Sequence, residues 1–273
     1  MTPGPSRRAV LLGGLLGGAG ALLAACESTG DGSGAAGKRV DGRFTSAAMK
    51  GAEVGWTMAY PPGHGPGDRL PVAVTLHGRG ATHATAFSTL HLDQVLAAVV
   101  ADGVHPFVVA SVDGGDHGYW HRRADGTDPG AMVVDEFIPL LGREGLDTGR
   151  LGLHGWSMGA YGALLLVGRD RLPVQALAVA SPALFTSAGA TPAGAFDSAA
   201  DFESNDVLAH PEWLDGVPLR VDCGREDPFY AASRSFTRSL LERPAGSFGP
   251  GAHTAAYWRS VAPAELRFLG RRL

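Results

Sequence analysis

The chain has 273 residues, of which 45% are hydrophobic and 18% charged, and its formal net charge is −4 at pH 7. This mild acidity argues against nucleic acid, or a membrane surface bound through basic residues, as a partner. The length fits one α/β domain with a substantial core, preceded by a short N-terminal segment.

The N-terminal segment has the features of an export signal. Ser6-Arg7-Arg8 begins it, and the apolar run over 9–25 is too short and too rich in glycine for a good membrane span. The arginine pair is similar to a twin-arginine signal. Leu23-Ala24-Ala25-Cys26 resembles the lipobox of bacterial lipoproteins. We expect cleavage after residue 25 and a lipid on Cys26 that anchors the chain outside the cytoplasmic membrane. An ordinary cleaved signal is the alternative.

Loss of residues 1–25 removes two arginines and no acid, which moves the net charge from −4 to −6. Residues 26–39 are rich in glycine, serine and alanine, so we expect a flexible linker after the lipidated cysteine. Residues 40–273 then form the single folded domain. This domain contains one cysteine, Cys223, so it has no internal disulfide.

Apolar runs alternate with helical patterns along the domain, as a parallel sheet with crossover helices requires. We expect strands over 54–60, 70–76, 107–112, 150–154, 174–180 and 218–223. We expect helices over 94–102, 131–141, 160–167, 230–241 and 263–273. The strands are almost continuously apolar, which predicts a mostly parallel central sheet covered by helices on both faces. Residues 182–215 lack a strong period, and we expect them to form a small cap.

The stretch Gly155-Trp156-Ser157-Met158-Gly159 stands between a predicted strand and a predicted helix. A G-x-S-x-G turn in this context is the nucleophile elbow of α/β-hydrolases. Small residues flank the serine because the backbone is strained and the turn brings strand and helix close together. The pattern predicts the α/β-hydrolase fold, with Ser157 as the nucleophile.

A serine nucleophile needs a base and a carboxylate that orients the base, and in this fold they follow in the order serine, acid, histidine. Asp222, Glu226 and Asp227 lie in or just after the last predicted strand. Asp222 falls inside that strand, so we choose Asp227, in a turn before a proline, with Glu226 as the second candidate. His253 precedes the final predicted helix, and we expect it to be the base.

Attack on an ester creates an oxyanion, which needs two backbone N–H donors. Met158, directly after the nucleophile, should supply one, and Arg79, in the loop 77–80, should supply the other. We expect His77 and His154, beside these turns, to be hydrogen-bonding supports. The aromatic candidates for the substrate pocket are Tyr119, Trp120, Trp156 and Trp258. For Tyr119 and Trp120, packing within a long loop is the alternative. No ligand spacing indicates a metal, and we expect no cofactor.

Four pieces of the chain together resemble the branch of the α/β-hydrolases that contains esterase D and the mycolyltransferases. They are Leu76-His77-Gly78-Arg79-Gly80, the elbow, Gly224-x-x-Asp227-Pro228-Phe229 and Gly251-x-His253-x-x-x-Tyr257-Trp258. The resemblance implies Ser157 as nucleophile, His253 as base and Asp227 as its partner, with the oxyanion held by the N–H groups of Arg79 and Met158. Members act on small esters, S-formylglutathione, phenolic esters or trehalose mycolates.

The chain departs from the mycolyltransferases, which usually have Glu in place of Asp227 and Asp-Gly-Leu in place of residues 77–79, and which are freely secreted. Formylglutathione hydrolases are cytosolic, which conflicts with the export signal. We therefore expect an exported serine carboxylesterase that acts on a small-molecule or lipid ester with a small or medium acyl group. The alternatives are acyl transfer to a sugar acceptor and a non-catalytic surface binding protein. The oligomeric state stays open.

Overall fold

The computed structural model describes Met1, residues 36–169 and residues 172–273. The expected export signal, Cys26 and most of the expected linker lie outside the described residues. Within the described part, no helix combines the length and the apolar character that a membrane crossing needs.

A seven-stranded sheet forms the centre of the domain, in the order β1-β2-β4-β3-β5-β6-β7. β2 is antiparallel to both of its neighbours, β1 and β4, and the remaining pairs are parallel. The sheet is therefore mixed and mostly parallel, as predicted. The strands are β1 (Arg39–Ser46), β2 (Ala52–Ala59), β3 (Pro71–Leu76), β4 (Val108–Val112), β5 (Asp147–Trp156), β6 (Ala176–Ala180) and β7 (Leu219–Asp222).

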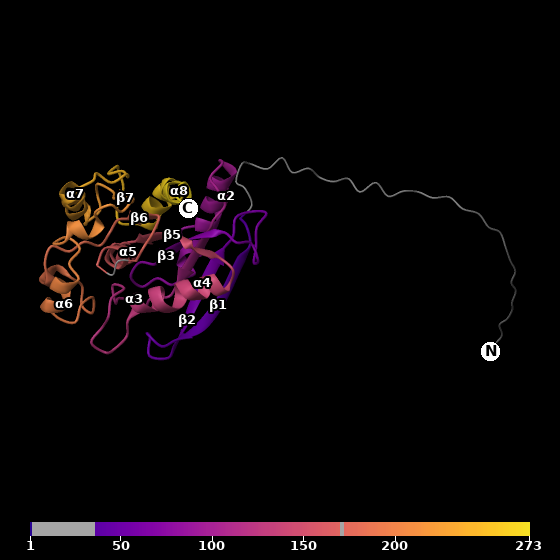
Figure 1. Cartoon of the computed structure of the whole chain (residues 1–273), viewed down its shortest axis with the longest axis horizontal. Helices are drawn as coiled ribbons and strands as arrows, with labels where there is room; N and C mark the ends of the chain where they lie inside the picture. Colours follow the sequence, from indigo (N-terminus) through magenta and orange to yellow (C-terminus); the bar gives the residue numbers. More distant parts are fainter. Residues whose placement is uncertain (2–35, 170–171) are drawn as a thin grey trace. The chain divides into compact units, whose positions relative to one another are not determined.

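Helices cover both faces of the sheet (Figure 1). One face packs against α1 (Thr85–Ser88), α2 (Leu92–Ala101) and α8 (Ala255–Gly270). The core on the other face includes residues of a π-helical segment (Met132–Phe137), α4 (Ile138–Arg143), α5 (Met158–Gly168), α6 (Ala199–Ser204) and α7 (Tyr230–Ser239). The short helix α3 (Pro129–Ala131) directly precedes the π-helical segment. Short 3-10 turns occupy Ala188–Ala190 and Pro211–Leu214.

Strand β3 contributes side chains to the two apolar cores, one on each face of the sheet. Its residues Val72, Val74 and Leu76 belong to the core on the α5 face, whereas Ala73 belongs to the core beneath α2 and α8. This alternation follows from the two-residue period of a strand. The helix α5 is buried along all of its 11 residues, which explains why it reads as continuously apolar.

The last helix begins earlier than predicted. The sequence pattern predicted this helix over residues 263–273. In the structure α8 begins at Ala255, and Pro263 lies inside it. Thr254 caps the helix, since its side chain accepts a hydrogen bond from the backbone N–H of Tyr257 at 3.4 Å. The longer helix starts directly after the loop that carries His253.

Candidate active site

The turn between β5 and α5 is tightly constrained. Ser157 has φ 55° and ψ −118°, a strained conformation for a residue with a side chain. A Cβ on Gly155 would lie 2.3 Å from the carbonyl oxygen of Gly159. A Cβ on Gly159 would lie 1.9 Å from the carbonyl oxygen of Leu76. Only glycine fits at either position, so the elbow fixes the serine at the end of β5.

The structure brings Ser157, His253 and Asp227 together from three separate segments. Oγ of Ser157 lies 2.8 Å from Nε2 of His253. Nδ1 of the same histidine lies 2.8 Å from Oδ2 of Asp227. The aspartate side chain is completely buried, whereas 23% of the histidine side chain is exposed. This is the geometry of a nucleophile, a base and the carboxylate that orients the base.

The environment of Asp227 keeps its carboxylate charged. Burial alone raises the pKa of this group, but the hydrogen bonds from His253 and from the backbone N–H of Phe229 outweigh burial, and the net effect lowers the pKa. An ionised Asp227 accepts from Nδ1–H of the imidazole, which leaves Nε2 free to accept the hydroxyl proton of Ser157.

The two other carboxylates near the last strand have different partners. The N–H of Glu226 donates to the carbonyl of Gly251 at 2.9 Å, and its carboxylate accepts from the N–H of Gly251. The carboxylate of Asp222, in β7, accepts from Arg220 and from both the N–H and the hydroxyl of Ser247, at 2.8 and 2.9 Å. Both groups therefore hold the loop that leads to His253, and neither contacts the histidine.

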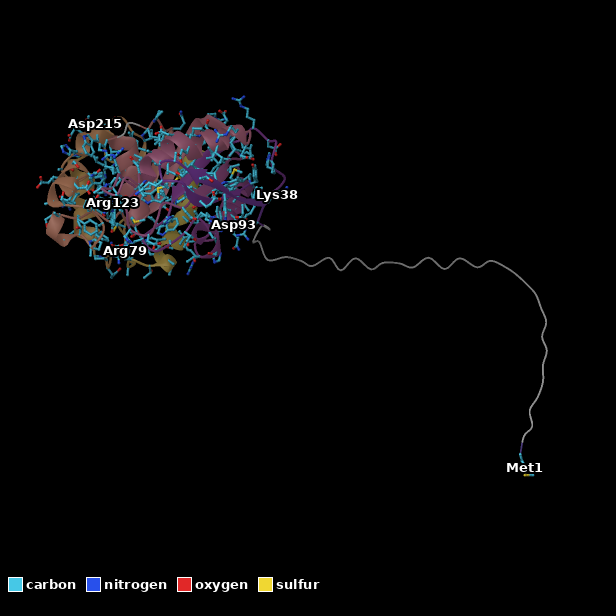
Figure 2. All side chains as sticks on the ribbon, turned by 90° about the horizontal axis from the view of Figure 1, so that it is seen from below. Met1, Lys38, Arg79, Asp93, Arg123 and Asp215 are labelled. Carbon is cyan, nitrogen blue, oxygen red and sulfur yellow. The ribbon has the colours of Figure 1, made fainter. Side chains whose placement is uncertain are left out.

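The loop after β3 lies directly against the elbow. A Cβ on Gly78 would lie 2.8 Å from Nε1 of Trp156 and 3.4 Å from Cβ of Ser157. The backbone N–H groups of Arg79 and Met158 have no hydrogen-bond partner among the described residues. Arg79 itself is an exposed residue of this loop (labelled in Figure 2). The residues around the serine thus include two backbone donors without partners, and an oxyanion hole requires donors of this kind.

Both flanking histidines are structural supports, as expected. His77 donates from Nδ1 to the carbonyl of Gly78 at 2.8 Å and accepts at Nε2 from the N–H of Gly114 at 3.0 Å. Burial lowers the pKa of His77, so the ring is neutral and holds the loop through one donor and one acceptor. His154 bonds to Thr75 through Nδ1 and to Glu265 through Nε2, which connects β3, β5 and α8.

A cavity of about 690 Å³ opens at the serine. Three of the aromatic candidates, Tyr119, Trp156 and Trp258, contribute to its wall. Phe185 and Phe229 add two aromatic rings that the sequence did not single out. The full lining is Gly78, Arg79, Ala81, Thr85, Tyr119, Trp156, Ser157, Ala183, Phe185, Ala190, Thr191, Pro192, Phe229, His253 and Trp258.

Trp120 is not among the residues that line this cavity, and it follows the alternative of packing within the loop. It is fully buried, its ring lies 5.1 Å from that of His77, and its Nε1–H donates to the carbonyl of the same histidine at 3.4 Å. Tyr119 and Trp120 both have positive φ, at 45° and 61°. Tyr119 lines the cavity, whereas Trp120 packs into the core against the loop 77–80.

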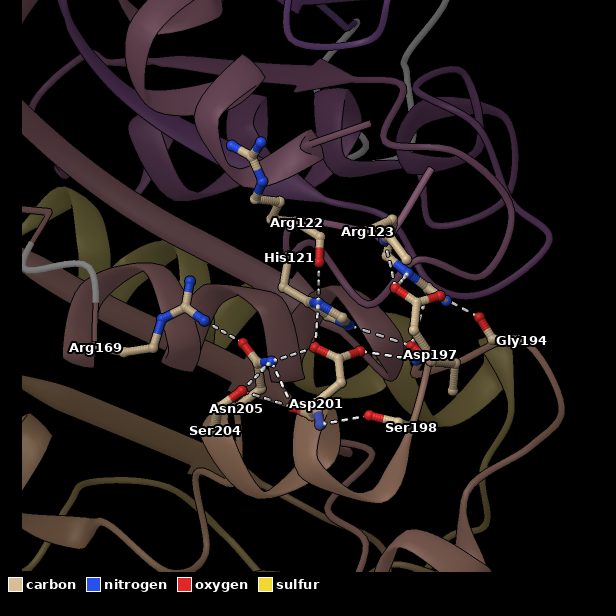
Figure 3. A network of polar contacts seen from close by, with 12 residues as sticks. His121, Arg122, Arg123, Arg169, Gly194, Asp197, Ser198, Asp201, Ser204 and Asn205 are labelled. Carbon is tan, nitrogen blue, oxygen red and sulfur yellow. Dashed lines mark hydrogen bonds and ion pairs between the residues drawn. The ribbon is translucent and has the colours of Figure 1, made fainter. Parts of the chain in front are cut away.

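The segment 182–215, expected as a small cap, supplies one wall of the cavity through Ala183, Phe185 and residues 190–192. Polar contacts fix its middle part to the loop after β4 (Figure 3). Arg123 pairs with Asp197 at 2.8 Å and also donates to the carbonyl oxygens of Gly194 and Ala195. These contacts hold the wall in place. Among the described residues, no group of three or more His, Cys, Asp or Glu is placed to hold a metal ion.

No protein-family model matches the chain, and no curated protein matches it in sequence. Solved structures do match. A ferulic acid esterase has a TM-score of 0.74 at 21% identity, over 86% of this chain and 97% of that chain. An S-formylglutathione hydrolase from Agrobacterium tumefaciens has a TM-score of 0.72 at 16% identity, over 89% and 98%. The fluorophosphonate-binding serine hydrolase F of Staphylococcus aureus has a TM-score of 0.69 at 17% identity, over 86% and 99%.

These similarities extend over nearly the whole length of each matched chain, so they concern the entire domain. At identities of 16 to 21% they establish the fold. The expected α/β-hydrolase fold is confirmed. The resemblance to hydrolases of the esterase D type is confirmed at the level of that fold.

Proposed function

We propose that this protein is a serine carboxylesterase that hydrolyses esters with a small or medium acyl group through an acyl-serine intermediate. The observation that carries the proposal is the pair of 2.8 Å contacts from Ser157 to His253 and from His253 to Asp227. These three residues lie at a cavity with aromatic walls. The backbone N–H groups of Arg79 and Met158 have no partner among the described residues. Two of the structural neighbours are named as a ferulic acid esterase and an S-formylglutathione hydrolase, and both names are consistent with this chemistry.

The proposed reaction forms an acyl-serine and then hydrolyses it. Oγ of Ser157 attacks the ester carbonyl carbon while its proton passes to Nε2 of His253, and the N–H groups of Arg79 and Met158 bind the resulting oxyanion. The C–O bond to the alcohol then breaks, and His253 gives its proton to the departing alkoxide. A water molecule next attacks the acyl-serine and gives a proton to His253. Collapse releases the carboxylic acid, and the proton returns to Ser157.

We further propose that the chain is exported and held at the membrane by a lipid on Cys26. The support for this part is the sequence of residues 1–26, which lie outside the described residues apart from Met1. Metabolic labelling of the expressing cells with a radioactive fatty acid tests it. Label in the full chain and none in a Cys26→Ala variant is the expected result, and equal label in both would contradict the anchor.

Hydrolysis of p-nitrophenyl esters from acetate to palmitate tests the proposed activity. We expect the purified full chain to act on the short and medium esters, since the cavity of about 690 Å³ holds an acyl group and a small alcohol. The same assay with added trehalose detects acyl transfer as a faster release of nitrophenol and a new sugar ester. Absence of turnover on every ester, with and without the sugar, would contradict the proposal.

A further inference from the structure

The cavity at Ser157 has an unbalanced charge. Among the described residues that line it, Arg79 is the one permanently charged residue, and none is an aspartate or a glutamate. The other ionisable lining groups are Tyr119 and His253, and the histidine already belongs to the proposed triad. An ester bound here therefore meets one positive charge and no negative charge from the cavity wall.

The guanidinium of Arg79 has no partner in the part of the chain that the structure describes: no carboxylate lies within 4.0 Å, and no side-chain hydrogen bond forms. Other arginines of the domain are paired, such as Arg123 at 2.8 Å from Asp197 and Arg220 at 2.6 Å from Asp222. The loop is already fixed through its backbone, where the N–H of Gly80 donates to the carbonyl of Asp116 at 2.9 Å. The side chain of Arg79 is thus not needed to hold its own loop.

Tyr119 adds a second donor near this charge. Burial raises the pKa of Tyr119 to about 12, and the nearby charge of Arg79 opposes that rise. The phenol is therefore neutral at physiological pH and carries an O–H that it can donate. Arg79 has only donors. The two groups together suit an acceptor with negative charge, and the rings of Phe185, Phe229 and Trp258 suit an apolar body.

We infer that the ester recognised by this site carries a carboxylate away from the scissile bond and that the guanidinium of Arg79 binds this carboxylate. The inference rests on the proposed esterase activity and narrows its substrate class. A planar guanidinium matches a carboxylate with two parallel hydrogen bonds. One positive charge also balances a single carboxylate, whereas a phosphate monoester would leave negative charge unmatched.

The net charge of the chain does not attract such a negatively charged substrate over long distances. The formal net charge is −4 at pH 7, so an anion is not attracted from a distance. The preference must then arise from the local contact with Arg79. We expect it to appear in KM more than in kcat, because this contact exists before and after the attack on the carbonyl.

The test compares matched pairs of esters on the purified full chain. One pair places the carboxylate on the acyl side: p-nitrophenyl hydrogen adipate and its neutral methyl ester. The other pair places it on the alcohol side: 3-carboxy-4-nitrophenyl acetate and p-nitrophenyl acetate. For each pair the readout is the ratio of kcat/KM for the charged ester to that for the neutral ester. Effects of a substitution on the oxyanion loop change both rates and cancel in this ratio.

In at least one pair we expect Arg79→Gln to lower the ratio about ten- to a hundredfold relative to the unchanged chain, the range of a charge-assisted hydrogen bond. Arg79→Lys should recover part of the ratio, and Arg79→Glu should lower it further. Arg43→Gln is the matched control, because Arg43 is an exposed residue of β1 outside the cavity lining. This control should leave both ratios unchanged.

The pair that responds identifies the side of the ester that carries the carboxylate. The inference would be overturned if, in both pairs, the ratio were the same for the unchanged chain and for Arg79→Gln while the neutral esters were turned over well. That outcome would leave the esterase proposal standing. Absence of turnover on all four esters would instead contradict the esterase proposal itself. The two failures are therefore distinguishable in one experiment.

Discussion

Glu226 and Gly251 exchange two hydrogen bonds. The N–H of Glu226 donates to the carbonyl of Gly251 at 2.9 Å, and the glutamate side chain accepts from the N–H of the glycine. Glu226 directly precedes Asp227, and Gly251 lies two residues before His253. Two hydrogen bonds thus connect the turn that contains Asp227 to the loop that contains His253, close to the contact between these two residues.

This relationship separates the roles of the two neighbouring carboxylates. Asp227→Asn should lower kcat about 10⁴-fold on p-nitrophenyl acetate, because an amide cannot hold the imidazole in the required tautomer. Glu226→Gln should lower it less than about tenfold, since the amide oxygen still accepts from Gly251. Circular dichroism checks that both variants fold. A greater loss for Glu226→Gln than for Asp227→Asn would show that the acid is misassigned.

His77 should act through the position of the oxyanion loop. His77→Phe removes the bonds to Gly78 and Gly114, so we expect kcat to fall about ten- to a hundredfold with little change in KM. His105→Phe is the control, because His105 is exposed and has no hydrogen bond to the described residues. Steady-state kinetics on p-nitrophenyl acetate measures the effect. Equal kcat for the two variants would mean that the loop keeps its position without His77.

The elbow should not tolerate a side chain at residue 159. Gly159→Ala places a methyl group against the carbonyl of Leu76, so we expect the free energy of unfolding to fall by about 3 kcal/mol or more. Gly189→Ala is the matched control, since nothing lies within 4 Å of the added Cβ. Urea denaturation gives both values. Coincident transitions for the two variants would contradict the close approach of α5 to β3.

Cys223 should be inert in the folded chain. Burial raises its pKa to about 12, so the reactive thiolate amounts to roughly one part in ten thousand at pH 8. Because the unfolded thiol ionises near its ordinary pKa of about 8.5, this residue makes the free energy of unfolding fall as the pH rises from about 8.5 towards 12. Iodoacetamide labelling with peptide mapping should find this cysteine unmodified until urea is added. Rapid labelling without urea would contradict its burial.

The motifs and the apolar runs allowed much of the fold and the site to be predicted. The strands predicted over 70–76 and 218–223 could be recognised as apolar runs because helices cover both faces of the sheet. The three proposed triad residues come from motifs whose order along the chain is fixed by the fold. The prediction of Asp227 over Glu226 agrees with the contacts of both residues.

Other elements could not be predicted from apolar runs or periodicity in the sequence. Strand β1 alternates exposed and half-buried residues, such as Arg43 and Phe44, so it has no apolar run. Phe185 lies in a segment without periodicity, and its place in the cavity depends on tertiary packing. Phe229, by contrast, directly follows the Asp227-Pro228 pair, so its place near the proposed triad could have been predicted from the sequence. For Trp120, composition could not distinguish a core ring from a cavity wall.

The most direct test of the central claim is the reaction of the purified full chain with a fluorophosphonate, followed by mass spectrometry. An activated Ser157 attacks phosphorus and displaces fluoride, so we expect one adduct per chain, located on this serine. Ser157→Ala should give no adduct, and His253→Ala should react far more slowly. An unlabelled chain, or a label that persists in Ser157→Ala, would contradict Ser157 as the nucleophile.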